Sequence, residues 1–414
     1  MKRIQFHYWG TMRTQVFQKS TEIVLNSGLS ITKIDNFFDL LPMQEQWNET
    51  LRRSGSDSPF LTFEWLSSWW NHLSGDSELF VLLVREQDQT IAIAPLMLVR
   101  RRLFRVLQFI GTGRSDYLDF IVTKRNQESL YLIFKYICDS RKYWDLICLQ
   151  DFPADSPNFA TMSLVMACLD MKSDEIVATV APYVAINTTW NDYLSSKSRK
   201  FRNDIRRAGS KLEKFGQFQI IHEPVSTSEH FDIMRNIEKQ SWKAEVGCCR
   251  LAESDASGFY LEFMEKFSGN NWLDLWLLKL NQEPIAYIIN FVYNNKIYDY
   301  STAYVSEYKH LFPGKALLVK SIEDAFNRNM SEYDLLKGDE PYKFDWTSHK
   351  RELYHVVAYR KSLRSILAYL LLIKLRRTLQ EYSFTHKFNL LRTKLANRLE
   401  MLTKRLSMMI GTKV

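Results

Sequence analysis

Two stretches of the chain that lie far apart in sequence repeat the same pattern of hydrophobic and polar positions. In the first, apolar runs at residues 79–86 and 90–99 flank the polar turn EQDQ; in the second, runs at 273–280 and 285–293 flank the turn NQEP. Apolar runs on both sides of a short polar turn predict a β-hairpin. Because REQDQTIAIA and KLNQEPIAYI also align with one residue of slack, the repetition indicates a duplicated domain.

Helical spacing of apolar residues precedes each hairpin, at residues 58–73 behind a Ser-Pro start and at residues 259–267. Further strands are expected at 106–111, 117–122, 144–150, 295–305 and 333–338, and further helices at 128–140 and 316–328. Hairpin, helix and strand, taken twice, predict an α+β protein with two similar halves. The expected boundaries are 31–184 for the first half, 185–359 for the second and 360–414 for a basic tail.

The composition supports packed domains and excludes several kinds of site. With 46% hydrophobic residues among 414, the chain can form two or three domains, and no apolar run approaches the roughly 20 residues of a membrane-spanning helix. The N-terminus lacks the apolar core of a signal peptide. The cysteines include no C-x-x-C pair and the histidines no H-x-x-x-H pair. We therefore expect no disulfide framework, no metal site, and a reducing cytoplasm.

The net charge of +8 is concentrated at the C-terminal end, because residues 360–414 hold thirteen Lys or Arg and two Glu, a net of +11. The tail is expected to form one or two basic amphipathic helices with an apolar stripe. The stripe comprises Leu390, Leu391, Leu395, Leu399 and Leu402. Such helices bind anionic membrane surfaces or partner helices, or pack on the body of the protein, and the pattern leaves these alternatives open.

A second basic segment, residues 195–216, joins the two halves and carries eight Lys or Arg against two acids. Arg199, Arg202 and Arg206 follow one another at three- and four-residue steps, so they can share one side of a helix. Two interpretations remain: a solvated helix face, which is usual for charge runs, and a helix that binds an anionic substrate.

Four segments together carry a family resemblance: SPFLTFEWLSSWW, SRKFRNDIRR, YDYSTAYVSEYKHLFPGKALLVKSIEDA and YDLLKGDEPYKFDW. In this order, over roughly residues 35–360, they resemble the GNAT-like acetyltransferase family of bacterial polysaccharide clusters, including the cellulose-biosynthesis acetyltransferases, relatives of the Fem-type aminoacyltransferases. The resemblance implies two tandem GNAT-like halves with mixed sheets. It also implies transfer of an acyl group from acetyl-CoA or another acyl-CoA to an amine or hydroxyl of a sugar or cell-envelope polysaccharide precursor.

The resemblance also implies a donor site, because GNAT enzymes hold the coenzyme A pyrophosphate on an Arg/Gln-x-x-Gly-x-Gly/Ala loop at a helix N-terminus, where free backbone N–H groups and the helix dipole favour phosphate. The matching residues are Phe312, Pro313, Gly314, Lys315 and Ala316. Leu311 departs from the pattern, since Arg or Gln is usual there. The first half has TKRNQESL at the equivalent place, without a glycine, so we expect it to serve as scaffold and acceptor-side wall.

The stretch GDEPYKFDW, residues 338–346, is either a surface turn or the loop that carries the chemistry, because Gly-Asp and Glu-Pro form turns for backbone reasons alone. The resemblance favours chemistry by direct attack on the thioester. Asp339 is then the expected base, with Lys343 holding an anionic acceptor or developing charge and Tyr342 orienting either. Asp299 and Tyr304 are the alternative base and acid.

Two other functions remain open from the sequence. An aminoacyl-tRNA-dependent transferase of the Fem kind would use the basic segments to bind RNA phosphates. A non-catalytic component of polysaccharide assembly would keep the fold without the donor loop, as Leu311 allows. The expected location is the cytoplasm, with peripheral inner-membrane contact through residues 360–414 as an alternative.

Overall fold

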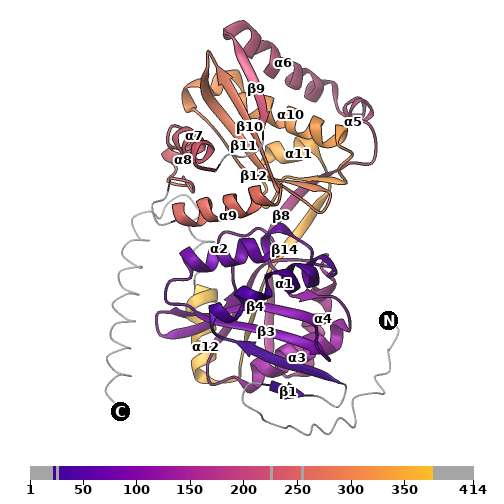
Figure 1. Ribbon diagram of the computed structural model, residues 1–414, viewed down its shortest axis with the longest axis vertical. Helices are drawn as coiled ribbons and strands as arrows, with labels where there is room; N and C mark the ends of the chain where they lie inside the picture. The colour runs from indigo at the N-terminus through magenta and orange to yellow at the C-terminus, as the bar shows by residue number, and fades with distance from the viewer. Residues whose placement is uncertain (1–21, 25–27, 224–226, 253–255, 376–414) are drawn as a thin grey trace.

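The protein folds into two halves that are stacked along its long axis (Figure 1). The computed structural model describes residues 22–24, 28–223, 227–252 and 256–375. The leucine stripe expected in the tail lies outside the described residues. The mixture of helices with one continuous sheet of parallel and antiparallel strands confirms the expected α+β class.

The first half is built on one end of the sheet, in the order β1-β2-β3-β4-β5-β7-β14-β8. Its strands are β1 (Glu22–Val24), β2 (Leu29–Ile34), β3 (Glu78–Glu86), β4 (Gln89–Arg101), β5 (Phe104–Phe109), β6 (Ile121–Val122), which pairs with β4, β7 (Leu146–Pro153), β8 (Lys172–Ala185) and β14 (Lys350–Tyr359). Its helices are α1 (Gln44–Arg52), α2 (Phe63–Leu73), α3 (Asn126–Asp139), α4 (Pro157–Cys168) and α12 (Leu363–Tyr369). Short 3₁₀ turns cover Phe37–Asp39, Leu41–Met43 and Pro59–Leu61.

The second half continues the same sheet in the order β8-β13-β12-β11-β10-β9. Its strands are β9 (Phe218–Glu223), β10 (Leu273–Leu280), β11 (Glu283–Tyr293), β12 (Lys296–Tyr304) and β13 (Glu332–Asp334). Its helices are α5 (Trp190–Ser196), α6 (Arg199–Phe215), α7 (Thr227–Lys239), α8 (Trp242–Glu245), α9 (Ser257–Gly269), α10 (Pro313–Asn327) and α11 (Pro341–Trp346), with a 3₁₀ turn at Ser306–Leu311 before α10.

The hairpins expected from the repeated pattern are present in both halves. In the second half, β10 pairs with β11 and the chain reverses at Asn281 and Gln282, both of which have positive φ. Asn294 and Asn295 make the same kind of turn between β11 and β12. A two-residue turn with positive φ at both positions matches the right-handed twist of the strands it joins, which explains these tight reversals.

Two strand predictions are wrong in extent. Of residues 117–122 only β6 is a strand, and of residues 333–338 only the first two belong to β13. In the second case the chain turns aside at Leu336, which has a φ of 57°, and at Gly338, with a φ of 132°. Such conformations end a strand, because extended strands require negative φ.

Two long strands join the halves, as Figure 1 shows for β8 and β14. β8 pairs with β14 over most of its length and with β13 near its end, and β14 returns to pair with β7 of the first half. The expected boundaries between the halves stay a prediction, because these strands run through both.

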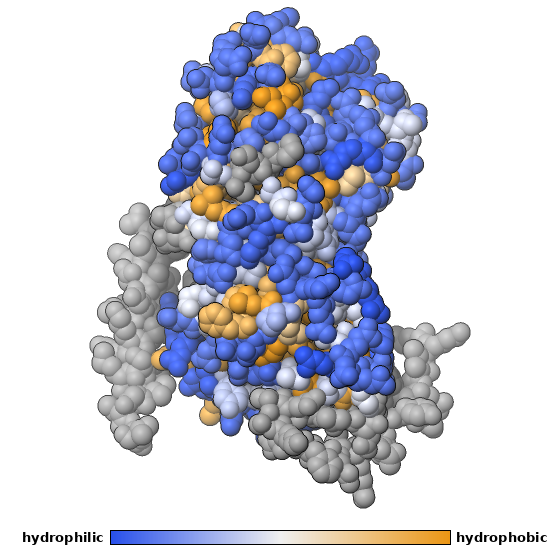
Figure 2. Space-filling model, viewed as in Figure 1, coloured by the Kyte–Doolittle hydropathy of each residue, from blue (hydrophilic) through white to orange (hydrophobic). Residues whose placement is uncertain are grey.

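An aromatic cluster fills the junction. Trp65 of α2 lies with its ring centroid 4.9 Å from Phe263 of α9 and 5.6 Å from Phe291 of β11, and its indole N–H donates to Ser115 Oγ at 2.9 Å. The helix expected at 58–73 is α2, which packs against α9 of the second half as well as against its own half. The face shown in Figure 2 is mainly hydrophilic, with hydrophobic residues exposed in separate patches on both halves.

A buried ion-pair cluster also crosses the junction. Arg351 of β14 binds Asp334 at 3.1 Å and, through both of its terminal nitrogens, Glu332 at 2.7 and 2.6 Å, both on β13. The Asp334 side chain is 1% exposed and accepts a further bond from the Tyr117 hydroxyl at 2.7 Å. A cluster this deep leaves charges without compensation if one partner is removed.

We therefore expect Arg351→Ala to lower the free energy of unfolding by about 3 to 5 kcal/mol, since two buried carboxylates lose their cation. The measurement is urea unfolding followed by tryptophan fluorescence. Arg52→Ala, which removes an exposed pair with Glu49, is the control and should change stability by less than about 1 kcal/mol. If the two substitutions lowered the free energy of unfolding equally, the buried ion pairs of Arg351 would not be what stabilises the junction.

Candidate active site

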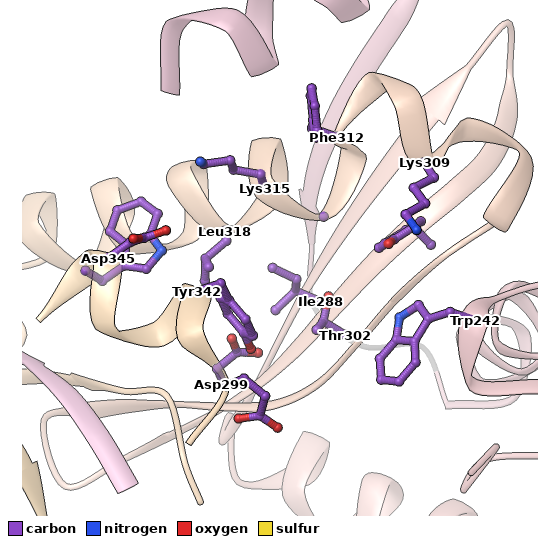
Figure 3. A pocket seen from close by; sticks show the side chains of 14 residues that line it. Trp242, Ile288, Asp299, Thr302, Lys309, Phe312, Lys315, Leu318, Tyr342 and Asp345 are labelled. Carbon is purple, nitrogen blue, oxygen red and sulfur yellow. The ribbon is translucent and has the colours of Figure 1, made fainter. Parts of the chain in front are cut away.

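A cavity opens where two parallel strands of the second half separate. β12 and β13 pair only from Lys296 and Glu332 to Tyr298 and Asp334. Immediately beyond this point lies a cavity of about 500 Å³ (Figure 3). Its lining residues are Trp242, Ile288, Asp299, Thr302, Tyr304, Lys309, Phe312, Gly314, Lys315, Leu318, Glu340, Tyr342, Asp345 and Trp346. Ligands of mixed α/β sheets commonly bind in such a crevice beyond the ends of parallel strands.

A β-bulge in β12 determines which side chains face this cavity. Asn290 of β11 is opposite Asp299, but Ile289 is opposite Ser301, so Tyr300 is the extra residue. The ring of Tyr300 stacks on Phe291 in the core. Bulges re-aim side chains in this way and are frequent beside active sites. Asp299 thereby faces the cavity together with Thr302 and Tyr304.

Asp299 is the buried carboxylate of the cavity. Burial raises its pKa to about 6, although the positive charges of Lys343 and Lys243 act to lower it. Within the described part of the chain its Oδ1 has no hydrogen-bond partner. A buried oxygen without a donor is unusual, because such groups are generally satisfied. Asp299 therefore has an acceptor oxygen at the cavity wall that no group of the described chain satisfies.

The N-terminus of α10 forms the opposite end of the cavity, where Figure 3 shows Phe312 and Lys315. Phe312 precedes the helix with a φ of 57°, and no side chain caps this end. A Cβ on Gly314 would lie 3.2 Å from the Tyr304 ring, so glycine allows the close approach of helix and strand. An uncapped helix start directed at a cavity favours an anion.

Of the five residues expected to bind the acyl donor, three line the cavity and two lie in the core. Phe312, Gly314 and Lys315 line the cavity, whereas Pro313 and Ala316 are buried on the packed side of the same turn. The ammonium of Lys211 from α6 lies 4.5 Å from the centre of the Phe312 ring and donates to the His310 carbonyl at 3.1 Å. The basic segment thus supports the loop before α10.

Of residues 338–346, Pro341–Trp346 form the short helix α11, and Gly338, Asp339 and Glu340 form the irregular segment that leads into it. Tyr342, Glu340, Asp345 and Trp346 line the cavity, but Asp339 is exposed and is absent from its wall. Burial raises the pKa of Tyr342, and the nearby Asp299 and Glu340 charges add to this. The structure therefore brings together Asp299, Tyr304 and Tyr342, and it does not bring Asp339 to them.

Lys343 belongs to α11, and its side chain is buried with the ammonium already bound. It donates to the carbonyl of Leu336 at 3.1 Å and of Lys337 at 2.9 Å, and pairs with Glu340 at 3.0 Å. These bonds hold the chain between β13 and α11. Lys343 is absent from the lining of the cavity, and its positive charge partly offsets the effect of burial on the pKa of Asp299.

The three arginines expected to bind substrate lie on α6 and do not line the cavity. Arg199 and Arg206 are exposed, while Arg202 donates to the carbonyls of Ser195 and Lys197 near the start of the helix. Their assignment to substrate binding stays a prediction.

Sequence analysis missed several cavity residues. Trp242, Thr302, Lys309 and Asp345 come from separate elements, and no local pattern connects them. Lys309 is the exception, because SEYKHLFPGK places it six residues before Lys315 in the segment that carries the family resemblance.

Among the described residues, one group has the spacing for a metal ion: His222, Asp274 and Asp324. Arg328 binds Asp274 and lies 3.3 Å from Asp324, so a cation already occupies the position between the carboxylates. Ion-pair formation accounts for this group.

Comparison with protein families gives one match, to the model described as an acetyltransferase (GNAT) domain, over residues 199–344. This range contains the whole wall of the cavity except Asp345 and Trp346. No curated protein matches the sequence.

Solved structures share the fold over most of the chain. FemX has a TM-score of 0.59 at 13% identity, over 79% of this chain and 98% of its own. L-PGS from Bacillus licheniformis has a TM-score of 0.48 at 16% identity, over 78% and 95%. A tandem GNAT protein from the clavulanic acid biosynthesis pathway has 0.43 at 11%, over 81% and 99%. The fold is GNAT-like, as expected, and the second half of the chain matches a GNAT acetyltransferase domain over residues 199–344.

Proposed function

We propose that the protein transfers an acyl group from acyl-CoA, with acetyl-CoA as the first candidate, to an amine or hydroxyl of a sugar or cell-envelope polysaccharide precursor. The observation that carries this proposal is one cavity that joins the uncapped start of α10 to the buried carboxylate of Asp299 across two separated strands. An anion site and a proton acceptor at opposite ends of one cavity are the two requirements of acyl transfer from a phosphorylated thioester.

The donor would bind with its pyrophosphate at the N–H groups of Gly314 and Lys315. Lys309 and Lys315 add positive charge at this end of the cavity. The pantetheine arm would follow the apolar wall made by Ile288 of β11 and Leu318 of α10, with the thioester toward Asp299. Leu311 is 3% exposed, so this departure from the family pattern is a core residue and leaves the backbone donors of the loop intact.

The reaction needs two proton transfers, one from the acceptor and one to the leaving thiolate. As the acceptor nitrogen or oxygen bonds to the thioester carbon, Asp299 takes its proton; as the carbon–sulfur bond breaks, Tyr304 gives a proton to the leaving thiolate. Burial raises the pKa of Tyr304, so its hydroxyl keeps its proton at neutral pH until the thiolate forms. Tyr342 is the second phenol in reach of the same cavity.

A Fem-like aminoacyl-tRNA-dependent transfer is the alternative. The likeness to FemX and the basic helix α6, whose Lys211 contacts Phe312 at the mouth of the cavity, support it. A third possibility, a non-catalytic assembly component, predicts that no donor binds. We place all three possible functions in the cytoplasm, because the sequence has no C-x-x-C pair.

Donor binding distinguishes these functions. Calorimetric titration of the full chain should show binding of acetyl-CoA and no comparable binding of charged tRNA. Lys315→Glu should weaken acetyl-CoA binding at least about tenfold, because it places a negative charge against the pyrophosphate. Lys320→Glu, on an exposed position of the same helix, is the matched control and should leave the affinity unchanged. Tight tRNA binding without acetyl-CoA binding would select the alternative.

Replacing the base should remove turnover and leave the fold intact. We expect Asp299→Asn to lower kcat by about 10² to 10⁴, measured as free-thiol release from acetyl-CoA with a panel of amino sugars as acceptors. The control is Asp339→Asn, which should retain activity within about twofold because Asp339 lies outside the cavity. Loss of activity in Asp339→Asn, with activity retained in Asp299→Asn, would identify Asp339 as the base.

The raised pKa of Asp299 sets the expected pH dependence. The base works only when it is ionised, so kcat/KM should fall about tenfold per pH unit as the pH is lowered through about 6. Asp299→Asn should abolish this acidic limb in whatever activity remains. A limb near pH 4 would show that an exposed carboxylate is the base.

A further inference from the structure

The helix that follows β14 exposes an apolar face. Four side chains at helical spacing share this face: Leu363, Ile366, Leu367 and Leu370 are 89%, 39%, 39% and 44% exposed. The opposite face of α12 packs on the first half through Ala368 and Tyr369, which belong to one buried cluster with Phe104 and Val106 of β5, and the Tyr369 ring stacks on Tyr359 of β14. Single exposed apolar residues are ordinary, but four on one helix face mark a binding surface.

Cations from distant segments surround this apolar face. The end of β4 and the turn that follows it contribute Arg100, Arg101 and Arg102. The next residue of the turn is Leu103, whose carbonyl accepts a hydrogen bond from Arg364 of α12. Arg141 lines one hollow of about 370 Å³ with Arg360 and Lys361. We call these seven cations, with Lys142 beside Arg141, the basic rim.

The basic rim is far from neutralised by its own carboxylates. Arg364 binds Asp145 at 2.8 Å, Lys361 binds Asp170 at 2.7 Å, and the Tyr369 hydroxyl of α12 donates to Asp174. The eight cations of the basic rim therefore outnumber these three carboxylates. Burial lowers the pKa of Arg360, and the nearby charges of Arg141 and Arg105 act in the same direction. An excess of mutually repelling cations around an apolar stripe is complementary to a negatively charged, partly apolar surface.

We propose that α12 and the basic rim dock the protein on an anionic lipid bilayer surface, with the four apolar side chains entering the interface and the rim contacting phosphate headgroups. The association is peripheral: among the described residues no helix is long and apolar enough to cross a bilayer. Interfacial helices combine an apolar stripe with Lys and Arg at its flanks in this way. In Figure 1, α12 lies against the first half, well away from α10 and α11, so docking there leaves the cavity accessible.

The test is sedimentation of the full chain with vesicles of phosphatidylcholine alone and of phosphatidylcholine with 30 mol% phosphatidylglycerol, a fraction that we choose to be about that of an anionic leaflet. We expect binding to the anionic vesicles, at least about tenfold weaker binding to the neutral ones, and loss of binding as salt is raised. The double variant Leu363→Ser/Leu367→Ser should weaken binding about tenfold or more, since both side chains leave the interface.

Two further variants keep the test decisive. Arg101→Gln/Arg102→Gln changes only exposed rim residues and should weaken binding to anionic vesicles alone, by about tenfold. Leu164→Ser removes an exposed leucine of α4 in the same half, 59% exposed, and should change nothing. Wild-type binding by the Leu363→Ser/Leu367→Ser variant would overturn the proposal in favour of residues 376–414. A dimer that this variant converts to a monomer, without vesicle binding, would overturn it in favour of a second copy.

Discussion

The separation of β12 from β13 is the constraint on which the site depends. Two parallel strands that stop pairing after three residues leave backbone groups without their ladder partners, which is costly in a buried sheet. The structure supplies other partners on the β13 side: the N–H groups of Leu335 and Gly338 donate to the carbonyls of Pro182 and Val180 on β8, at 2.9 and 2.8 Å. The chain after β13 therefore follows β8 and diverges from β12, and the space between them becomes the cavity.

The residues that stabilise this divergence explain why several charged groups of the second half are buried. Lys343 binds the two carbonyls that the turn at Leu336 leaves unpaired. Lys337 extends to the first half, where its ammonium binds the Ser115 carbonyl at 2.9 Å and Asp151 at 3.2 Å. With Arg351 and Tyr117 on Asp334, the first half fixes the far wall of the cavity by direct contact, which gives it a structural role in the proposed activity.

Sequence reasoning recovered what local pattern determines and missed what pairing across the chain determines. The hairpins and the start of α10 follow from alternation and turn residues, whereas Asp299 and Tyr304 came from the family resemblance as alternative base and acid, and the structure places both at the cavity. The preference for Asp339 over Asp299 did not hold geometrically, because a bulge in β12 and the left-handed Leu336 decide which carboxylate faces the cavity. Neither feature has a local signature, and the return of β14 to the first half depends on partners more than 160 residues away.

The first half has a corresponding pair of parallel strands, but the space between them is filled by protein. Its parallel strands β5 and β7 pair even more briefly, at Val106 and Leu107. Here the segment before β6 fills the space: Leu118 donates to the Asp151 carbonyl at 3.0 Å, and the ring of Phe120 packs 5.2 Å from Phe109 and 6.1 Å from Phe152.

The helix that follows the filled gap differs as well. α3 also begins after a residue with positive φ, Arg125, but it has Glu128 in its first turn where α10 has no acid. A carboxylate at a helix start occupies the positive end of the dipole and repels phosphate. The gap between β5 and β7 is thus filled, and Glu128, bound by Arg125, occupies the first turn of α3. Under the proposed function, the second half would hold the phosphorylated donor and the first half would support it.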